Sequence, residues 1–326
     1  MIAVVLVGGE GTRLRPLTYD RPKAMLPIAG RPFLAHLLDR LVAGGVERVI
    51  FSCGYLPDPI VAGFGDGYGG MALEYAIEPE PLDTAGAIAF AARGRVGAGP
   101  FLALNGDVLA SSSLAELMAI HRQRGARATL TLTAVADPSR YGLVLSDDDG
   151  AVTAFLEKTA QDGAPGGPGP FWINAGQYAL DASVLDLIAP DRRVNIEREI
   201  FPALVGGGLH AWQAGGYWDD IGTPASYLAA NVAVVRGVLG GAPGDSRVAD
   251  DAVVDPSATV DGGSVIGAGA RVGPRATVRG SVVHENAMIG AGASLDGAVT
   301  GRGSAIAAGA RLVPGTIVGA QERYGA

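Results

Sequence analysis

Glycines and cationic side chains near the start of the chain form the first group of residues that could do chemistry. The apolar run Ile2–Val7 is followed by Gly8–Thr12, a turn rich in glycine. Glycine lacks the Cβ atom that would keep an anion away from backbone N–H groups. Arg13, Arg15 and Lys23 follow, so hydrogen-bond donors and positive charge converge just after a predicted strand. This arrangement favours binding of a phosphate chain at the carboxyl edge of a sheet.

A strand with a flexible glycine turn is the simpler interpretation of the same residues. The loop contains neither the Gly-Lys-Ser/Thr of a Walker loop nor the Gly-x-Gly-x-x-Gly of dinucleotide-binding folds. Those two mechanisms therefore lose support, and the loop alone does not identify the ligand.

Carboxylates follow two other predicted strands. Asp107 comes after the apolar run Phe101–Asn105, in an Asn-Gly-Asp sequence that is also typical of a turn. Asp219 and Asp220 lie side by side in the predicted strand Tyr217–Ile221. Neighbouring side chains of a strand point to opposite faces, so only one of these two can face a site. Carboxylates at strand ends are suited to binding Mg²⁺ together with phosphate oxygens.

Lysine is rare in this chain, and both lysines lie in stretches suited to phosphate. Lys23 follows the glycine loop, and Lys158 ends Phe155-Leu156-Glu157-Lys158. A solvated strand end explains Glu157 and Lys158 equally simply. A compact ammonium can nevertheless sit on a phosphate as a point charge, which the planar guanidinium of arginine cannot copy.

The full N-terminal string resembles the signature of the sugar-1-phosphate nucleotidylyltransferases. It reads Gly-Gly-x-Gly-Thr-Arg-Leu-x-Pro-Leu-Thr from Gly8 to Thr18, and Pro22-Lys23 follows. The Asn-Gly-Asp-Val-Leu, Pro-Leu-x-Thr-Ala-Gly and Ile-Glu-Arg-Glu sequences, with repeats after them, resemble the mannose-1-phosphate guanylyltransferase type. The resemblance covers essentially the whole chain. It departs from the family at Asp83, where relatives usually have glycine, which weakens any inference about the base.

The resemblance implies a Mg²⁺-dependent transfer of a nucleotidyl group from a nucleoside triphosphate to a sugar-1-phosphate. The best match is GTP with mannose-1-phosphate. Heptose-1-phosphate, glucose-1-phosphate, a cyclitol phosphate, or UTP or dTTP remain open alternatives.

The family pattern Trp-x-Asp-x-Gly-Thr selects Asp220 over Asp219 as the second metal ligand. The implied catalytic residues are Arg13, Lys23, Asp107 and Asp220, with the metal on Asp107 and Asp220. The implied nucleotide-binding residues are Leu6, Gly8, Gly9, Gly11, Thr12, Arg13, Lys23, Leu82, Thr84, Gly86, Asn105 and Gly106. The implied sugar-phosphate residues are Tyr141, Gly142, Glu157, Lys158, Asn174 and Gly176.

Alternating apolar runs and amphipathic stretches predict the elements that position these residues. The first half predicts a mostly parallel sheet with helices on both faces, including helices Phe33–Val42 and Leu114–Arg124. A β-rich part from Arg127 would form the sugar side of a cleft. The expected fold is therefore a Rossmann-like three-layer α/β/α nucleotidyltransferase domain over residues 1–240.

A six-residue period begins after a glycine-rich linker. Aliphatic residues recur from Val254 through Val260, Ile266, Val272 and Val278, with small residues four places later. This period predicts a short left-handed parallel β-helix over residues 248–326, with room for about four coils. The phase slips between Val278 and Ile289 and after Leu295 predict loops at corners. Open ends of such a solenoid favour a homo-oligomer.

Composition excludes several other classes of protein function. The net charge of −8 and the lack of a basic run argue against nucleic-acid binding. The single cysteine, Cys53, and the absence of a signal peptide or membrane-length apolar run predict a soluble, cytoplasmic protein without membrane contact. A hexapeptide acyltransferase is a weaker alternative, since His284 is the only histidine among the repeats. A non-catalytic regulatory subunit is also disfavoured, because the implied metal and phosphate residues are all present.

Overall fold

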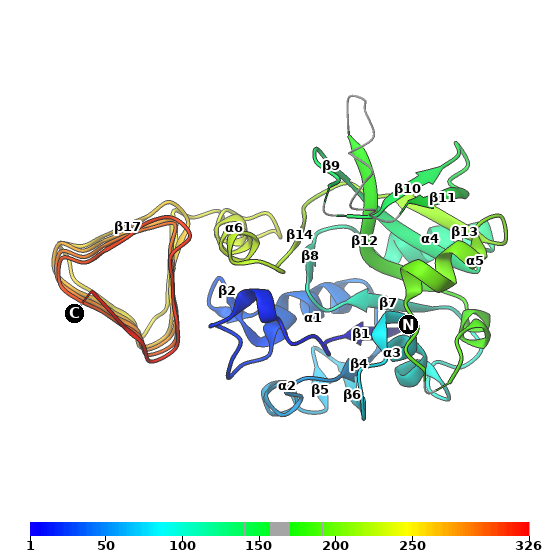
Figure 1. Cartoon of the computed structure of the whole chain (residues 1–326), viewed down its shortest axis with the longest axis horizontal. Coiled ribbons are helices and arrows are strands. Elements are labelled where there is room, and N and C mark those ends of the chain that lie inside the picture. Colours follow the sequence, from blue (N-terminus) through cyan, green and yellow to red (C-terminus); the bar gives the residue numbers. More distant parts are fainter. Residues whose placement is uncertain (140, 157–169, 191, 326) are drawn as a thin grey trace. The chain divides into compact units, whose positions relative to one another are not determined.

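The computed structural model describes residues 1–139, 141–156, 170–190 and 192–325. The chain divides into two compact units (Figure 1). The first comprises Met1–Gly9, Leu37–Val108 and Ser112–Trp218, and the second comprises Glu10–His36, Leu109–Ser111 and Asp219–Ala326. These units do not coincide with the predicted boundary between residues 240 and 248, because the segment 10–36 groups with the C-terminal part. That boundary remains a prediction.

A mixed ten-stranded sheet forms the centre of the first unit, in the order β11-β10-β12-β7-β1-β4-β6-β5, with β9 and β13 joined beside β12. Strands β7, β1, β4 and β6 are parallel, and β12 runs antiparallel to β7. The strands are β1 (Ile2–Leu6), β4 (Arg48–Cys53), β5 (Gly67–Tyr68), β6 (Met71–Ile77), β7 (Phe101–Asn105), β9 (Ala128–Val135), β10 (Leu143–Ser146), β11 (Val152–Leu156), β12 (Phe171–Leu180) and β13 (Leu209–Gln213). The expectation of a Rossmann-like α/β sheet is confirmed.

Helices form where apolar residues recur at helical spacing. In α1 the residues Phe33, Leu34, Leu37, Leu38 and Leu41 are buried, which defines one apolar stripe. Helix α4 begins at the Ser113 N-cap and ends at Gly125 in a left-handed conformation. The α-helices are α1 (Phe33–Ala43), α2 (Asp58–Phe64), α3 (Asp83–Ala92), α4 (Leu114–Arg124), α5 (Phe201–Leu204) and α6 (Pro224–Val235); 3₁₀ turns span Thr12–Leu14, Lys23–Met25 and Ala182–Leu187, and a π turn spans Ile196–Ile200.

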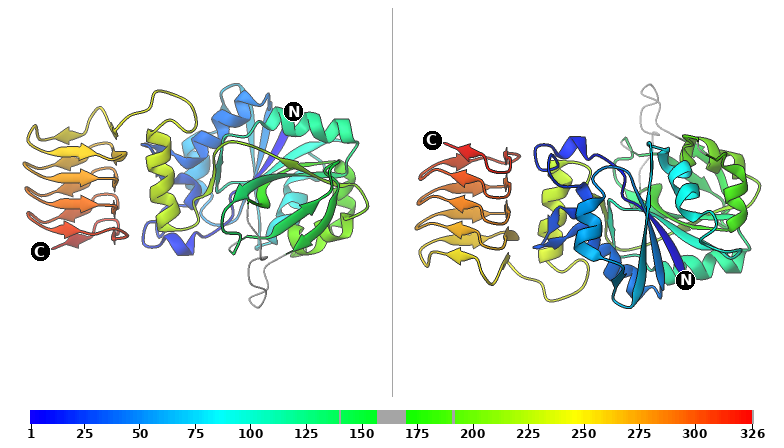
Figure 2. Two further views of the ribbon diagram at one scale, coloured as in Figure 1. Left: turned by 90° about the horizontal axis from the view of Figure 1, so that it is seen from above. Right: turned by 90° about the horizontal axis from the view of Figure 1, so that it is seen from below.

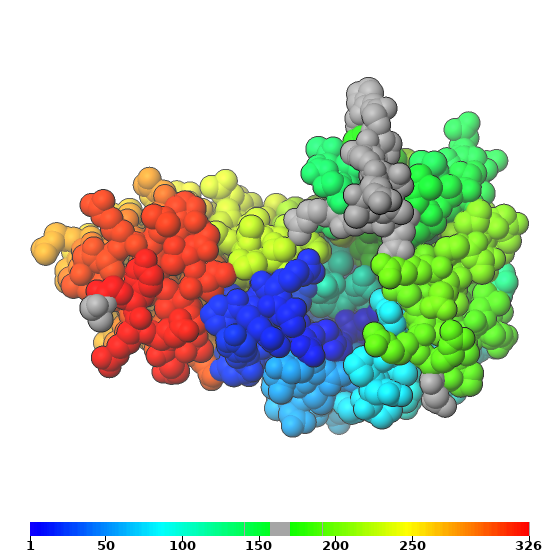
Figure 3. All heavy atoms as spheres, viewed as in Figure 1, coloured from blue at the N-terminus to red at the C-terminus, as the bar shows by residue number. Residues whose placement is uncertain are grey.

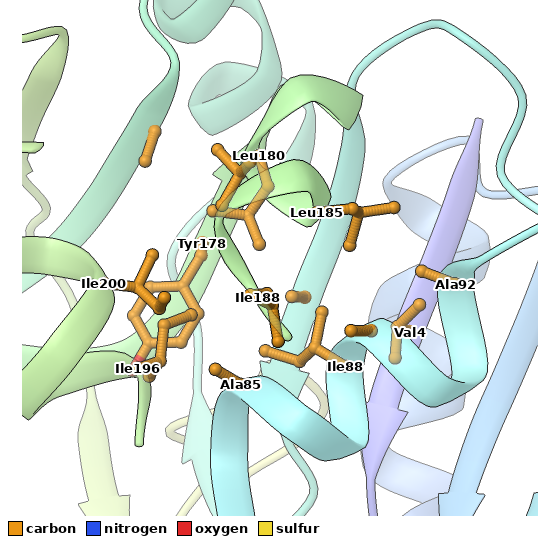
Figure 4. Packing of buried hydrophobic residues seen from close by; sticks show 14 of the residues in the cluster. Val4, Ala85, Ile88, Ala92, Tyr178, Leu180, Leu185, Ile188, Ile196 and Ile200 are labelled. Carbon is orange, nitrogen blue, oxygen red and sulfur yellow. The ribbon is translucent and has the colours of Figure 1, made fainter. Parts of the chain in front are cut away.

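The main core of the first unit lies between α3, the sheet and the segment that follows β12. Ile88 and Ala92 of α3 pack against Val4 of β1. Tyr178 and Leu180 of β12 belong to the same buried cluster (Figure 4). The uninterrupted apolar character of β1 and β7 follows from burial on both faces of the sheet. This packing fixes the strand ends from which the predicted site residues emerge.

The C-terminal part of the second unit is a left-handed parallel β-helix, as predicted. Three parallel sheets form its sides, seen end-on as a triangle in Figure 1 and as stacked coils in Figure 2. The first is β15 (Ser246–Val248), β18 (Ser264–Ile266), β21 (Val282–Val283), β24 (Val299–Thr300) and β27 (Ile317–Val318). The second is β16 (Val253–Val254), β19 (Arg271–Val272), β22 (Met288–Ile289), β25 (Ala305–Ile306) and β28 (Arg323–Tyr324). The third is β17 (Thr259–Asp261), β20 (Thr277–Arg279), β23 (Ser294–Asp296) and β26 (Arg311–Leu312).

The phase slips in the six-residue period are shortened corners, not the loops expected from the sequence. Val260 and Ile266 lie six residues apart, whereas Val278 and Val283, which pair with them in the next coil, lie five apart. The same shortening separates Leu295 from Thr300. One residue is therefore lost at the corner while the inward-facing ladder continues without interruption.

Helix α6 packs along the outer face of the sheet β15-β18-β21-β24-β27 (Figure 2). The outward residues Val265, Val282 and Val299 on that face are buried, unlike the outward residues Val253 and Met288 on the next side. The hairpin β2 (Pro27–Ile28) and β3 (Arg31–Pro32) lies in the same unit. Strands β8 (Val108–Ala110) and β14 (Trp218–Asp220) form a separate two-stranded sheet. Among the described residues, no helix is both long and apolar enough to cross a membrane.

Candidate active site

The ends of β1 and β7 are brought together by a glycine. Gly106 donates its N–H to the carbonyl of Leu6 over 2.8 Å. A Cβ atom at Gly106 would lie 2.4 Å from that oxygen, so only glycine allows this approach. Asn105 and Asp107 flank the contact and therefore leave the sheet beside the end of β1. Two of the predicted nucleotide residues, Leu6 and Gly106, are thus in direct contact.

The glycine loop after β1 begins in the first unit. Gly8 accepts a hydrogen bond from Tyr55 N–H, and a Cβ atom there would lie 3.1 Å from the backbone nitrogen of Gly54. A Cβ atom at Gly9 would meet nothing within 4 Å. Gly8 therefore packs tightly against the residue after β4, whereas the space above Gly9 is open.

A polar cluster gathers around a bulge in β12. Gly176 has φ of 70°, and a Cβ atom there would lie 2.6 Å from the Asn105 side chain. Asn174 accepts from Gly176 N–H and donates to Tyr178 Oη and Glu197 Oε1, over 2.9 and 2.7 Å. The bulge therefore brings the predicted residues Asn105, Asn174 and Gly176 together.

Electrostatics place Asp107 near this cluster. Complete burial raises the pKa of Tyr178 well above its usual value, and the negative charges of Glu197 and Asp107 raise it further. Tyr178 is therefore a neutral hydrogen-bonding group. Glu197, from the Ile-Glu-Arg-Glu sequence, was not among the predicted site residues. The signal that could have identified it is that sequence itself, which already carried part of the family resemblance.

Two aromatic side chains, Tyr141 and Trp218, pack against each other next to the bulge in β12. The rings of Tyr141 and Trp218 are 5.4 Å apart, edge to face. Trp218 donates its indole N–H to the carbonyl of Ala175 over 3.0 Å. Gly142 accepts from Asn174 N–H, and a Cβ atom there would approach Phe155 to 3.4 Å. Gly142 thus lies beside Asn174, and Tyr141 packs on Trp218, a residue of the Trp-x-Asp-x-Gly-Thr sequence that was not among the predicted site residues.

The predicted base-reading segment is tied to the loop before the π turn. The N–H groups of Ala85 and Gly86 both donate to the carbonyl of Val194. A Cβ atom at Gly86 would lie 2.6 Å from the carbonyl oxygen of Arg192, so close packing requires this glycine. Thr84 accepts from Ile196 N–H over 2.9 Å. These amides at the start of α3 therefore have protein partners, and Thr84 and Gly86 have clear packing roles.

Asp83 occupies a conformation that favours glycine. Its φ is 61°, in the left-handed region, which glycine adopts without the steric cost of a Cβ atom. Aspartate tolerates this region better than most residues. Its Oδ1 accepts from Thr84 N–H over 2.7 Å and from Asn195 Nδ2 over 3.0 Å. The departure from the family pattern therefore preserves the turn and adds a link to the π-turn loop.

The other residues predicted to bind phosphate after the glycine loop, Gly11, Thr12, Arg13 and Lys23, lie in the second unit. Gly11 has φ of 62°, and a Cβ atom there would lie 3.2 Å from Cβ of Lys23 and from Cγ2 of Thr18. Thr18 donates its hydroxyl to the carbonyl of Gly11 over 2.9 Å. Thr12 begins the short 3₁₀ turn that follows. The turn thus packs directly against Lys23, whose side chain is largely buried.

Arg13 and Asp220 both border a glycine of the second unit. A Cβ atom at Gly222 would lie 2.7 Å from a guanidinium nitrogen of Arg13 and 2.9 Å from Asp220 Oδ2. The glycine of the Trp-x-Asp-x-Gly-Thr motif therefore leaves room for the arginine side chain. Glu157 and Lys158, predicted for the sugar phosphate, lie outside the described residues.

The donor set suits a hard divalent cation. Asp107 and Asp220 offer carboxylate oxygens, and Mg²⁺ is commonly held by one or two carboxylates with phosphate oxygens and water completing the shell. The described residues contain no group of three or more His, Cys, Asp or Glu arranged to hold a metal by themselves. Asp107 lies in the first unit and Asp220 in the second, so the binding of one cation by both carboxylates remains a prediction.

The second unit also contains an apolar groove of about 830 Å³ between α6 and the β-helix. Leu228 and Val232 line one side, and Val299 and Ile317 line the other. No predicted site residue lines this groove.

Comparison with known proteins shows what this chain is similar to. Residues 2–237 match the nucleotidyl transferase family. A mannose-1-phosphate guanylyltransferase of Mycobacterium tuberculosis is 44% identical over 292 residues, covering 87% of this chain and 79% of that protein. A mannose-1-phosphate guanyltransferase of Schizosaccharomyces pombe is 35% identical, covering 80% and 73%. The crystal structure of HddC from Yersinia pseudotuberculosis, described as complexed with GMP-PN, is 32% identical, with a TM-score of 0.60, and the match covers 71% of this chain and 97% of that one.

Proposed function

Because the chain belongs to the nucleotidyl transferase family, we propose that it transfers a guanylyl group from GTP to mannose-1-phosphate. The products are GDP-mannose and pyrophosphate. The observation that carries this proposal is the similarity to the mycobacterial mannose-1-phosphate guanylyltransferase. Since that match covers 87% of the chain, it must include part of the β-helix as well as the transferase segment.

The reaction is an in-line displacement that needs no general base. An oxygen of the sugar phosphate attacks the α-phosphorus, and pyrophosphate leaves with the electron pair of the broken P–O bond. The second pKa of a phosphate monoester is about 6, so the nucleophile is largely ionised at neutral pH. The protein must instead hold two anions together and stabilise charge on the transferring group.

Cationic residues supply most of that stabilisation in this proposal. Arg13 and Lys23 bind the triphosphate, together with backbone N–H groups of the glycine loop, and Lys158 binds the incoming sugar phosphate. The contact of the Gly11 turn with Lys23 supports a shared role for these residues. The burial of Lys23 supports it further, because a buried ammonium interacts more strongly with an anion than a solvated one.

Asp107 and Asp220 would hold Mg²⁺, which supplies charge neutralisation at the transferring phosphoryl group when bound. The resemblance to the family supports this pair. Arg13 and Asp220 border the same glycine, Gly222, which supports a place for both side chains at the triphosphate.

The sugar is recognised, in this proposal, by groups around the β12 bulge. Asn174 and Glu197 offer an amide and a carboxylate, and their mutual hydrogen bond holds both in place. Tyr141 and Gly142, with Glu157, complete the polar and apolar contacts that a hexose ring requires. Thr84 and Gly86 shape the base-binding segment through the contacts described above, and Leu82 accepts a hydrogen bond from Val194 N–H over 3.1 Å.

We also propose a homo-oligomer assembled through the β-helix. Val253 and Met288 are 53% and 52% exposed on one of its sides, and Val313 is 65% exposed at a corner. Exposed aliphatic side chains on a solenoid are suited to contact with a second copy. Light scattering of the purified chain tests this, and a monomer at micromolar concentration would contradict it.

Pyrophosphate release over a grid of nucleoside triphosphates and sugar-1-phosphates tests the proposed activity. We expect the highest kcat/KM for GTP with mannose-1-phosphate in the presence of Mg²⁺. A higher kcat/KM for heptose-1-phosphate, glucose-1-phosphate or a cyclitol phosphate would keep the chemistry and change the substrate. Release that does not depend on any sugar phosphate would contradict the proposal.

A further inference from the structure

Two ion pairs connect one corner of the β-helix to the segment just before Lys23. Arg21 pairs with Glu285, and Asp20 pairs with Arg302. Glu285 and Arg302 lie seventeen residues apart, after β21 and β24, and so occupy equivalent positions in successive coils. Asp20 and Arg21 carry opposite charges, and each faces a residue of the opposite charge in one of two successive coils. The segment can therefore bind this corner in only one register.

A buried hydroxyl connects the segment on the other side of Lys23. Tyr227 of α6 donates its O–H to the carbonyl of Pro27 over 2.6 Å, and its oxygen lies 2.9 Å from His284 Nε2. Because the carbonyl can only accept, His284 must be the donor to Tyr227. Both side chains are almost fully buried. His284 directly precedes Glu285, so one corner of the β-helix reaches both sides of Lys23.

Asn231, one turn further along α6, fixes the hairpin that follows. Its Oδ1 accepts from Ala29 N–H over 2.8 Å, and its Nδ2 donates to the carbonyl of Tyr227 over 2.9 Å. Ala29 has φ of 49°, which is unfavourable for alanine and must be held by its surroundings. Asn231 is fully buried and supplies that hold.

Residues 22–26, which include Lys23, are therefore held at both ends by groups 200 to 282 residues later in the sequence. In the space-filling view the dark blue N-terminal segment abuts the red coils of the β-helix (Figure 3). Lys23 itself lies in a single 3₁₀ turn, which has little stability of its own. Its position must then depend on these contacts.

We propose that the corner of the β-helix at His284–Arg302, acting with Tyr227 of α6, is a positioning element for Lys23 and so sets the affinity for the nucleoside triphosphate. This inference rests on the proposed function, in which Lys23 binds the triphosphate. It gives the β-helix a role in substrate binding in addition to assembly. His284, Glu285, Arg302 and Tyr227 are positioning residues, since they act through the segment and not on the substrate.

A charge swap tests the inference in the full-length protein. Arg21→Glu and Glu285→Arg should each raise KM for GTP about five- to tenfold, with kcat and KM for mannose-1-phosphate within about twofold of wild type. The double variant should restore KM for GTP, because it rebuilds the pair with reversed charges. Asp261→Asn is the matched control, since Asp261 pairs with Arg279 inside the β-helix and contacts no part of the segment. It should leave all three constants unchanged.

Hydrogen exchange provides a readout that does not depend on activity. Amides of residues 18–31 should exchange faster in Arg21→Glu, Glu285→Arg and Tyr227→Phe than in wild type and Asp261→Asn, and protection should return in the double swap. Unchanged exchange and unchanged KM for GTP in an active, folded Glu285→Arg protein would overturn the inference. If wild type does not use GTP at all, the proposed function fails, and the exchange data still decide whether the corner holds the segment.

Discussion

The strand-end site of the first unit and the Lys23 segment of the second are positioned in different ways. Asn105 and Asp107 leave a buried strand, and the contact of Gly106 with Leu6 fixes them within a few residues of that strand. Lys23 lies in a short 3₁₀ turn, and its segment is held by Glu285 and by Tyr227, which His284 contacts in turn. A local strand therefore fixes one part of the proposed site, whereas the other part depends on distant parts of the chain. Substitutions can test this difference directly.

The largest effect is expected at the carboxylates. Asp107→Asn should lower kcat by several orders of magnitude, because loss of metal-mediated charge stabilisation is worth several kcal/mol. Asp220→Asn should have a similar effect, while the neighbouring Asp219→Asn serves as the matched control with kcat within a few-fold of wild type. Steady-state pyrophosphate release measures all three, with thermal melting to confirm folding. Near-normal turnover of Asp107→Asn would remove the carboxylate from the mechanism.

The strand-end contact should be intolerant of a single added carbon. Gly106→Ala places a Cβ atom 2.4 Å from a backbone oxygen that cannot move without distorting β1. We expect a loss of about 3 kcal/mol in the free energy of unfolding. Gly99→Ala is the control, since a Cβ atom there meets nothing within 4 Å. Equal denaturant midpoints for the two variants would show that the junction is not tightly packed.

The two lysines should separate the two substrates. Lys23→Ala should raise KM for GTP tenfold or more, and Lys158→Ala should raise KM for mannose-1-phosphate instead. Lys158→Arg should rescue only in part, because the planar guanidinium differs in shape from an ammonium. Initial rates with each substrate varied in turn provide the measurement. Equal effects of both alanine variants on both constants would argue against separate sites.

Acid should loosen the hold on the Lys23 segment. Burial lowers the pKa of His284 to about 4 from its ordinary value of 6.5, although Glu285 and Asp20 act in the opposite direction and Arg21 adds to the lowering. The unfolded chain then binds a proton that the folded chain does not, so stability falls as pH drops from about 6.5 towards 4. We expect this group to contribute a loss of about 1 kcal/mol at pH 5.5 relative to neutral pH.

His284→Asn should flatten the pH dependence of the melting temperature in that range. Glu285 acts at lower pH. Burial alone would raise its pKa, but the hydrogen bond and charge of Arg21 outweigh this and lower it, so its contribution is lost only on further acidification. An unchanged pH profile in His284→Asn would show that the histidine is not held neutral.

The smallest effect concerns the left-handed turn at Asp83. Asp83→Ala and Asp83→Gly both remove the hydrogen bond from Asn195, so their difference reports the backbone conformation alone. Because φ is 61°, the glycine variant should be more stable by about 1 kcal/mol. Chemical denaturation compares them. Equal stabilities would mean that the turn relaxes without cost.

The sequence predicted those parts of the fold whose determinants are local. Helix α4 and strand β7 have the predicted bounds, since each is a continuous run ended by glycine or a polar turn. The β-helix could be predicted because each coil repeats one pattern. The shortened corners of the β-helix could not be predicted. The inward position after Val278 is taken by Val283, which lies among several valines, and the equivalent position of the next coil is taken by Thr300.

The structure brings predicted residues together where a motif and a strand end coincide, as at Asn105. Glu197 and Trp218 lie in the Ile-Glu-Arg-Glu and Trp-x-Asp-x-Gly-Thr sequences, but those sequences do not show that the bulge in β12 brings Glu197 to Asn174 and Trp218 to Ala175. The hold of His284 and Glu285 on the Lys23 segment was missed for a similar reason. Contacts that span more than 250 residues have no signature in the order of the residues alone.

Identification of both products from one reaction tests the central claim most directly. Purified protein with GTP, mannose-1-phosphate and Mg²⁺ should give GDP-mannose and pyrophosphate in equal amounts, as measured by phosphorus NMR, and the α-phosphorus of GTP should appear in the nucleotide sugar. Orthophosphate in place of pyrophosphate, or pyrophosphate without a nucleotide sugar, would contradict guanylyl transfer to the sugar phosphate.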